Sequence, residues 1–85
     1  MEIEFDPAKD TGNVAKHGIS LARAVDLEIL AYVADDRANY GEVRYRAFGW
    51  IDKVGYCLAF TDRGGAIRAI SLRRASAKEM KRHVE

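Results

Sequence analysis

The sequence predicts an α+β fold, with a small, twisted antiparallel β-sheet of three or four strands, two N-terminal helices and one C-terminal helix. Two observations support this prediction. The second half of the chain holds strand-like runs separated by short turns, and signals for helix starts lie before and after them. A chain of 85 residues encloses one core, so residues 1–85 form a single domain. We expect the helices on one face of the sheet and the other face open.

The first two expected elements are a strand and a helix. Residues 1–5 alternate apolar and acidic side chains, which is typical of a short strand with one buried face. Asp6 can then cap a helix with its side-chain oxygen, and the ring of Pro7 pre-sets φ for the first helical position. We expect this helix to end near Gly18.

The next segment leaves two alternatives open. Ser20 can cap a second helix, in which Leu21, Ala24 and Val25 fall at helical spacing. The apolar run at residues 29–34 is typical of a strand, and equally of the end of that helix, because periodicity does not separate the two in so short a run.

The second half predicts a meander followed by a helix. The strand-like runs are residues 44–51, 54–61 and 66–73. The turns between them are residues 52–53 and 62–65, where glycines permit the positive φ of tight hairpins. Ser76 and Glu79 form the S-x-x-E pattern of a capping box, which predicts a basic terminal helix from about Ala77.

The composition is that of a globular protein, with 48% hydrophobic and 32% charged residues. The single cysteine, Cys57, cannot close a disulfide within the chain and is typical of a small buried apolar residue. No Cys/His spacing fits a structural metal, and we expect neither a metal nor a cofactor. The charged N-terminus excludes a signal peptide, and no apolar run could span a bilayer. We therefore expect a cytoplasmic protein that does not contact membranes.

Charge is distributed unevenly along the chain. Residues 63–85 hold seven basic and two acidic side chains, whereas residues 1–62 hold seven basic and eleven acidic ones. This asymmetry is consistent with an anion-binding face, and equally with a solvated charged helix.

Two arginines of the last strand are candidate phosphate ligands. Strict alternation places Arg68 and Arg73 on opposite faces of the sheet unless a bulge intervenes. An arginine among apolar neighbours either reaches the sheet edge or pairs with an anion, and the planar guanidinium fork suits a phosphate. Structural roles at the surface are the alternative.

His17 and Glu42 are candidates for proton transfer. His17 lies where the first helix ends, and the helix dipole there favours a protonated imidazole. Alternatively, Lys16 and His17 only satisfy the last carbonyls of that helix. Glu42 follows a Tyr-Gly pair and could act as a base or orient another group, although a surface ion pair, with Arg44 or with the basic C-terminal region, is the default.

Aromatic residues concentrate in the predicted sheet, where most should belong to the core. They are Tyr40, Tyr45, Phe48, Trp50, Tyr56 and Phe60. If its strand is regular, Trp50 shares a face with Phe48, Arg44 and Arg46, which could form a platform for base stacking.

A set of short motifs extends along nearly the whole chain. It comprises Phe5-Asp6-Pro7-Ala8-Lys9, Asn13, Lys16-His17-Gly18-Ile19-Ser20-Leu21, Asp36-Arg37, Tyr40-Gly41-Glu42, Arg44, Phe60-Thr61-Asp62-Arg63-Gly64, Arg68-Ala69-Ile70-Ser71-Leu72-Arg73-Arg74-Ala75 and Glu79. The set resembles the BrnT family of bacterial ribonuclease toxins. His83 departs from that family, which often has tyrosine near this position.

The resemblance implies a fold similar to that of the RelE and ParE toxins and a role in a type II toxin–antitoxin system. It implies RNA cleavage that arrests growth, and neutralisation by a cognate antitoxin with a ribbon-helix-helix DNA-binding domain. Promoter DNA would be bound only through that antitoxin. A small sheet with an open face and a cationic helix also favours a heteromeric complex, and we expect a heterotetramer of two toxins and two antitoxins.

The resulting hypothesis is a metal-independent endoribonuclease that uses the 2′-hydroxyl of RNA as the nucleophile. Arg68 and Arg73 stabilise the phosphate, His17 or Glu42 transfers protons, and Lys16 gives electrostatic support. The side chains expected to bind RNA are Arg44, Arg74, Lys78, Lys81 and Arg82. The alternative function is a non-enzymatic module that binds a nucleic acid or a protein through the same basic helix and sheet face.

Overall fold

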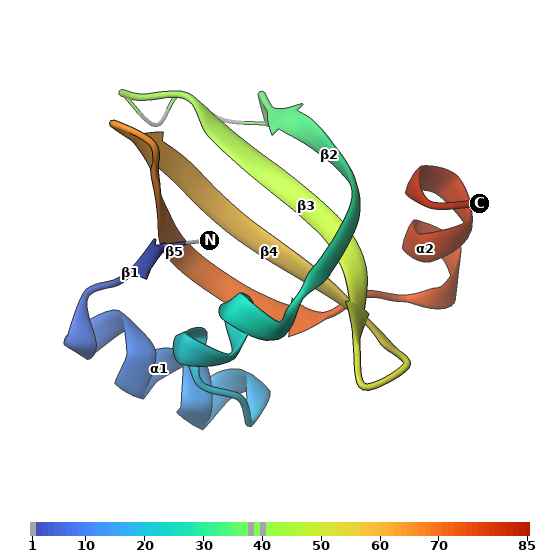
Figure 1. Cartoon of the computed structure of the whole chain (residues 1–85), viewed down its shortest axis with the longest axis horizontal. Helices are drawn as coiled ribbons and strands as arrows, with labels where there is room; N and C mark the ends of the chain where they lie inside the picture. The colour runs from blue at the N-terminus through green and yellow to red at the C-terminus, as the bar shows by residue number, and fades with distance from the viewer. Residues whose placement is uncertain (1, 38, 40) are drawn as a thin grey trace.

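The computed structural model describes residues 2–37, 39 and 41–85. In chain order the elements are β1 (Ile3–Glu4), α1 (Pro7–His17), the 3-10 helix η1 (Leu21–Asp26), β2 (Glu28–Asp35), β3 (Arg44–Ile51), β4 (Val54–Arg63), β5 (Ala66–Arg74) and α2 (Ala77–His83). Within these residues the strands form one five-stranded sheet in the order β1-β5-β4-β3-β2 (Figure 1). The α+β class is confirmed.

The sheet is larger than expected and is not purely antiparallel. β1 extends it at one edge, where Ile3 and Glu4 pair in parallel with Ile67 and Arg68 of β5. At the other edge residues 28–35 form β2, which pairs with β3. The strand alternative for this apolar segment is therefore the one that occurs. Strands β2 to β5 are four antiparallel strands, as expected, and the parallel pairing of β1 with β5 makes the five-stranded sheet mixed.

Local capping signals set the helix boundaries. The side chain of Asp6 accepts a hydrogen bond from the Ala8 amide at 2.9 Å, and α1 ends at Gly18, whose φ is 73°. The Ser20 hydroxyl accepts a bond from the Ala22 amide at 3.1 Å. The second expected helix is thus present, but it is a six-residue 3-10 helix. These helix starts and the end near Gly18 are confirmed.

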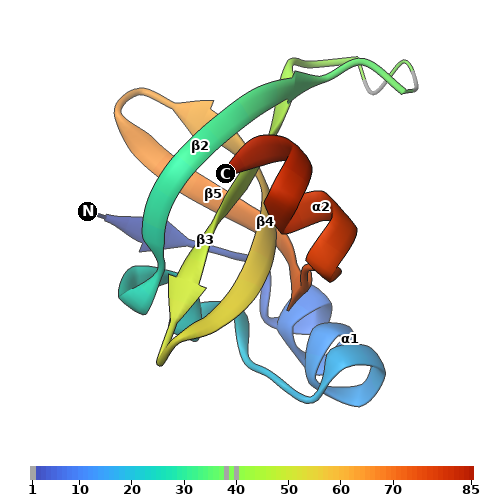
Figure 2. The same cartoon turned by 90° about the vertical axis from the view of Figure 1, so that its right-hand side faces the viewer.

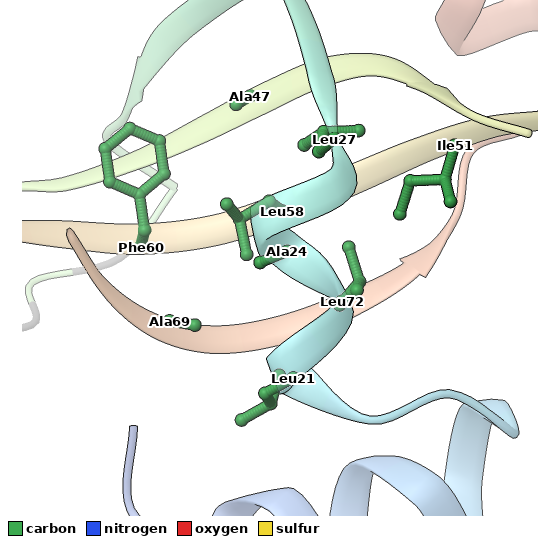
Figure 3. Close-up of a cluster of buried hydrophobic side chains, with 9 residues drawn as sticks. All are labelled: Leu21, Ala24, Leu27, Ala47, Ile51, Leu58, Phe60, Ala69 and Leu72. Carbon is green, nitrogen blue, oxygen red and sulfur yellow. The ribbon is translucent and has the colours of Figure 1, made fainter. Parts of the chain in front are cut away.

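The main hydrophobic core lies between η1 and one face of the sheet (Figure 3). Leu21 and Ala24 of η1 are fully buried, and Leu27, which follows η1, is nearly so. They pack against buried side chains of the strands, namely Ala47, Ile51, Leu58, Phe60, Ala69 and Leu72. We call this side of the sheet the η1 face.

The C-terminal helix packs on the other face, so the expectation that all helices share one face is wrong. Phe48 and Cys57 are buried there, opposite to the η1 face, and Met80 of α2 packs against them. In Figure 2, α2 lies over β3 on the side toward the viewer. Phe48 and Cys57 are apolar and need cover from water, and α2 is the element that supplies it. We call this side the α2 face.

A bulge in β5 changes which of its side chains share a face. Ala59 of β4 pairs with Ser71 and Phe60 pairs with Ala69, so that Ile70 has no partner opposite it. Arg73 pairs with Cys57 and Arg68 pairs with Thr61 on β4. Directly paired residues share a face, and Cys57 and Thr61 are an even number of residues apart on β4. Both arginines therefore lie on the α2 face.

Asn13 completes the outer edge of β5 beyond the end of β1. Its amide nitrogen donates to the Leu72 carbonyl at 2.8 Å, and its amide oxygen accepts from the Leu72 N–H at 3.0 Å. The side chain thus replaces a neighbouring strand and fixes α1 to the sheet. Among the described residues, the helices lack the length and apolar character needed to cross a bilayer.

Candidate functional site

An aromatic stack lies at the centre of the α2 face. The rings of Phe48 on β3 and His83 on α2 are 4.2 Å apart between centroids and nearly parallel, at 8°. The guanidinium carbon of Arg46 lies 5.8 Å from the Phe48 centroid. The stack therefore holds an imidazole and a guanidinium around one buried ring.

A cationic hollow of about 390 Å³ opens beside this stack. Its lining residues are Arg46, Lys78, Glu79, Arg82 and His83. Three of them carry permanent positive charge, and the carboxylate of Glu79 is paired with Arg73. The Nε of Arg46 is buried and has no hydrogen-bond partner among the described residues. A buried donor without an acceptor suits an anionic ligand.

Arg73 and Glu79 form a bidentate ion pair at the base of α2. Nη1 and Nη2 of Arg73 lie 2.9 Å from the two carboxylate oxygens of Glu79. These hydrogen bonds lower the pKa of the Glu79 carboxyl to about 2 and raise the pKa of Arg73 above its ordinary value. Both groups therefore remain charged at neutral pH, and the pair fixes the start of α2 against the end of β5.

The ion pair leaves part of the Arg73 guanidinium available. Arg73 donates two hydrogen bonds to Glu79 and one to the Arg74 carbonyl, in the last case from Nη1 at 3.2 Å. A guanidinium has five N–H donors, so the Nε–H and one Nη2–H have no acceptor among the described residues. These two donors form the side-on edge of the fork, which matches two oxygens of a phosphate.

Arg68 lies farther along the same face, near the edge of the sheet. Its Nη1 is 3.7 Å from a carboxylate oxygen of Glu4 on β1, and both side chains are partly exposed. Thr61, its neighbour on β4, is buried, and its hydroxyl has no hydrogen-bond partner in the described part of the chain. The bulge at Ile70 thus places Arg68 and Arg73 on one face, which strict alternation does not predict.

The residues predicted for proton transfer lie elsewhere. His17 is half-buried and Lys16 exposed at the end of α1, which packs against β5 and η1. Neither makes a hydrogen bond or ion pair with another described residue. Glu42 pairs with Arg63 at the end of β4, with an N···O distance of 3.4 Å, which is the expected surface ion pair with the basic C-terminal region. The structure therefore does not bring these groups to Arg73.

The predicted RNA-binding side chains divide into two sets. Lys78 and Arg82 line the hollow, while Lys81 is exposed on α2 and Arg74 is exposed at the end of β5. Arg44 is half-buried at the start of β3.

Of the aromatic residues expected in the sheet, Tyr40 lies outside the described residues. The expectation that Arg44, Arg46, Phe48 and Trp50 share a face is confirmed by the regular pairing of β3 with β4.

The sequence did not reveal that His83 stacks on Phe48 beside Arg46 and that this stack borders the cationic hollow. Alternation along β3 identifies Arg46 and Phe48 as neighbours, but it does not show that α2 covers them. The signal that could have found His83 is the basic character of α2 next to an arginine-bearing strand face.

Another hollow, near the turn between β3 and β4, differs in charge. It measures about 420 Å³ and is lined by Trp50, Lys53 and the carboxylates of Asp26, Glu28 and Asp52, two of which pair with Arg23. Its carboxylates outnumber the nearby cations, whereas cations dominate the hollow beneath α2, which is therefore the better anion site. No group of three or more metal-ligating side chains occurs among residues 2–37, 39 and 41–85.

A family model described as "Ribonuclease toxin, BrnT, of type II toxin-antitoxin system" matches residues 5–79. A search of curated proteins finds no match for the chain.

Proposed function

Because the chain belongs to the BrnT family of ribonuclease toxins of type II toxin–antitoxin systems, we propose that it cleaves RNA in the cationic hollow beneath α2. The observation that carries this assignment is the meeting of permanent cations with an imidazole in that hollow, around the stacked rings of Phe48 and His83. Phosphate binding and proton transfer both require such groups within hydrogen-bond reach of one reacting centre.

The proposed reaction is a transesterification that needs no metal ion. The 2′-oxygen of a ribose forms a bond to the adjacent phosphorus, while the bond from phosphorus to the 5′-oxygen of the next nucleotide breaks. The proton of the 2′-hydroxyl leaves to a base, and another proton reaches the departing 5′-oxygen. The products are a 2′,3′-cyclic phosphate and a 5′-hydroxyl, so that no water or co-reactant enters the step.

Two arginines supply electrostatic stabilisation in this proposal. The free side-on donors of Arg73 and the buried Nε of Arg46 bind the oxygens of the reacting phosphate. Arg68, on the same face, contacts a flanking phosphate in place of Glu4. Lys78 and Arg82, which line the hollow, hold the neighbouring phosphates, and the basic side chains farther away contact the rest of the strand, namely Arg44, Arg74 and Lys81.

Proton transfer falls to His83 rather than to His17 or Glu42. A general acid or base must be within about 3 Å of the proton that it moves, or one water away. His83 lines the same hollow as Arg46, whereas His17 is on α1 and Glu42 is paired with Arg63. Lys16, next to His17, then has no role in the chemistry.

The experiment is cleavage of a defined RNA by the purified protein in EDTA. A matched RNA with a single 2′-deoxyribose at the cleavage position serves as the control substrate. We expect cleavage to persist in EDTA, to stop at the deoxy position, and to leave cyclic phosphate and 5′-hydroxyl ends. Loss of cleavage in EDTA, or products with 5′-phosphate ends, would overturn the proposed reaction.

A type II toxin has a cognate antitoxin, and we further propose that this antitoxin carries a ribbon-helix-helix DNA-binding domain. Two chains build such a domain, so the complex would be a heterotetramer that contacts promoter DNA only through the antitoxin. Its site of action would be the cytoplasm, where its RNA substrates occur. Light scattering on the purified complex should give the mass of two toxins and two antitoxins, and the mass of one of each would contradict this stoichiometry.

A further inference from the structure

Part of the η1 face carries aromatic side chains that no described helix covers. η1 is tied to the turn between β3 and β4 by the ion pair of Arg23 with Asp52, at 3.0 Å, and so covers the end of the face near that turn. Figure 3 shows the ring of Phe60 at the far end of the core cluster, to the side of η1. Among the described residues, no helix covers the sheet surface beyond η1.

Three aromatic rings form a row across β2, β3 and β4 on this open surface. Tyr45 stacks on Phe60 with a centroid distance of 5.4 Å, and Tyr32 meets Tyr45 edge-on at 6.0 Å. Tyr32 is 65% exposed although its neighbours in the row are more deeply placed. The row borders a hollow of about 380 Å³, which Ile29 and Ile67 also line.

The charge of this hollow favours a protein ligand over RNA. Asp62 is the charged residue among the described side chains that line it, and its carboxylate is exposed. Asp62 has no ion-pair partner among the described residues, and such a carboxylate repels phosphates but attracts a lysine or arginine. Aromatic rings with apolar neighbours are the usual anchors of protein interfaces. The cationic hollow beneath α2, on the opposite face, has the reverse character.

We propose that the row formed by Tyr32, Tyr45 and Phe60 is a docking surface for an apolar segment of the cognate antitoxin, with a cationic side chain of that segment facing Asp62. The inference rests on the family membership that implies an antitoxin, and it adds a partner surface to the proposed RNA site. This surface and the hollow beneath α2 lie on opposite faces of the sheet. Mutations can therefore separate antitoxin affinity from RNA cleavage.

The test is calorimetric titration of the full-length protein with its purified cognate antitoxin. Tyr32→Ala removes an exposed ring and should weaken the dissociation constant by about tenfold or more. Asp62→Asn keeps an acceptor for the Gly65 N–H, which lies 3.1 Å from the carboxylate, but removes the charge. It should weaken binding and reduce its dependence on salt. Val25→Ala, at an exposed apolar residue of η1, is the matched control and should change the affinity by less than about twofold.

RNA cleavage by the same variants distinguishes this inference from the proposed function. Tyr32→Ala should cleave RNA at the wild-type rate. An antitoxin affinity that is unchanged in both Tyr32→Ala and Asp62→Asn would overturn the docking surface. Slower RNA cleavage by Tyr32→Ala would also overturn it. So would the loss, in Tyr32→Ala, of a self-association of the toxin, because the aromatic row would then bind a second copy of this chain. If the wild-type protein failed to cleave RNA while Tyr32→Ala still bound the antitoxin weakly, the RNA site would be wrong and the docking surface would stand.

Discussion

Arg73 and Glu79 face each other through two parallel hydrogen bonds, each with an N···O distance of 2.9 Å. Arg73 lies near the end of β5 and Glu79 in the first turn of α2. The pair therefore sets the angle at which α2 leaves the sheet and covers Phe48. Glu79 also accepts a hydrogen bond from the Ser76 amide, at 3.0 Å, which joins the ion pair to the helix cap.

We predict that Glu79→Gln lowers the free energy of unfolding at pH 7 by about 2 kcal/mol, allowing for the solvent that reaches the pair. Glutamine keeps an acceptor for the Ser76 amide, so the substitution mainly removes the charge. Because the folded-state pKa of Glu79 is about 2 and its ordinary value is 4.5, the folded state binds this proton less readily than the unfolded chain. The stabilisation is therefore complete above about pH 4.5 and is lost as the pH falls toward 2.

Urea unfolding of both proteins across this pH range measures the effect. The difference in unfolding free energy should be constant above pH 4.5 and should shrink as the pH approaches 2. A difference that is the same at every pH would show that the ion pair does not hold the carboxyl at its low pKa.

Asn13→Ala should destabilise the fold by about 2 to 4 kcal/mol, because it leaves both backbone groups of Leu72 without their partners. Asn13 is buried, so water does not readily replace the amide. Asn13→Asp is the informative comparison, since a carboxylate can accept from the Leu72 N–H but repels the carbonyls of Leu72 and Ile19. Denaturant unfolding should rank both variants well below the wild type, and a loss under about 0.5 kcal/mol for either would contradict the role of Asn13.

Gly49→Ala should prevent the normal pairing of β2 with β3. A Cβ atom at this position would lie 1.8 Å from the carbonyl oxygen of Glu28, a backbone atom that cannot rotate away. Gly12→Ala is the matched control, since a Cβ atom there meets nothing within 4 Å and α1 gains a better helix former. We expect thermal melting to show a strongly lowered midpoint for Gly49→Ala and a small rise for Gly12→Ala. Equal midpoints for Gly49→Ala and the wild type would refute the close approach.

The Cys57 thiol should react slowly in the folded protein. Burial raises the pKa of this thiol, with a partial opposing effect from the charge of Arg73, and the residue is only 2% exposed. The reaction with a disulfide reagent at pH 8 should be about a hundredfold slower in buffer than in denaturing urea. Similar rates in the two solutions would mean that α2 does not keep Cys57 covered.

Most element types could be predicted from the sequence because their signals are local. The cap at Asp6, the glycine at residue 18 and the capping box of Ser76 and Glu79 each fix a helix boundary without reference to the rest of the fold. The short β1 strand was also indicated, but its parallel partner was not. That pairing depends on where α1 returns the chain, which is a tertiary contact.

The candidate site was less predictable for two physical reasons. Alternation placed Arg46 and Phe48 together, but a single unopposed residue, Ile70, decides whether Arg68 and Arg73 share a face, and alternation does not reveal a bulge. His83 joins the site only because α2 covers the face opposite to η1. The amphipathic pattern of a seven-residue helix does not specify which face of a sheet it covers.

The assignment of RNA cleavage to the hollow beneath α2 is tested most directly by the single-turnover cleavage rate of His83→Phe. Phenylalanine keeps an aromatic ring against Phe48 but cannot transfer a proton, and His17→Phe is the matched variant at the end of α1. We predict a fall of about a hundredfold for His83→Phe and less than about threefold for His17→Phe, with both variants folded. A full rate in His83→Phe together with a large loss in His17→Phe would contradict the assignment.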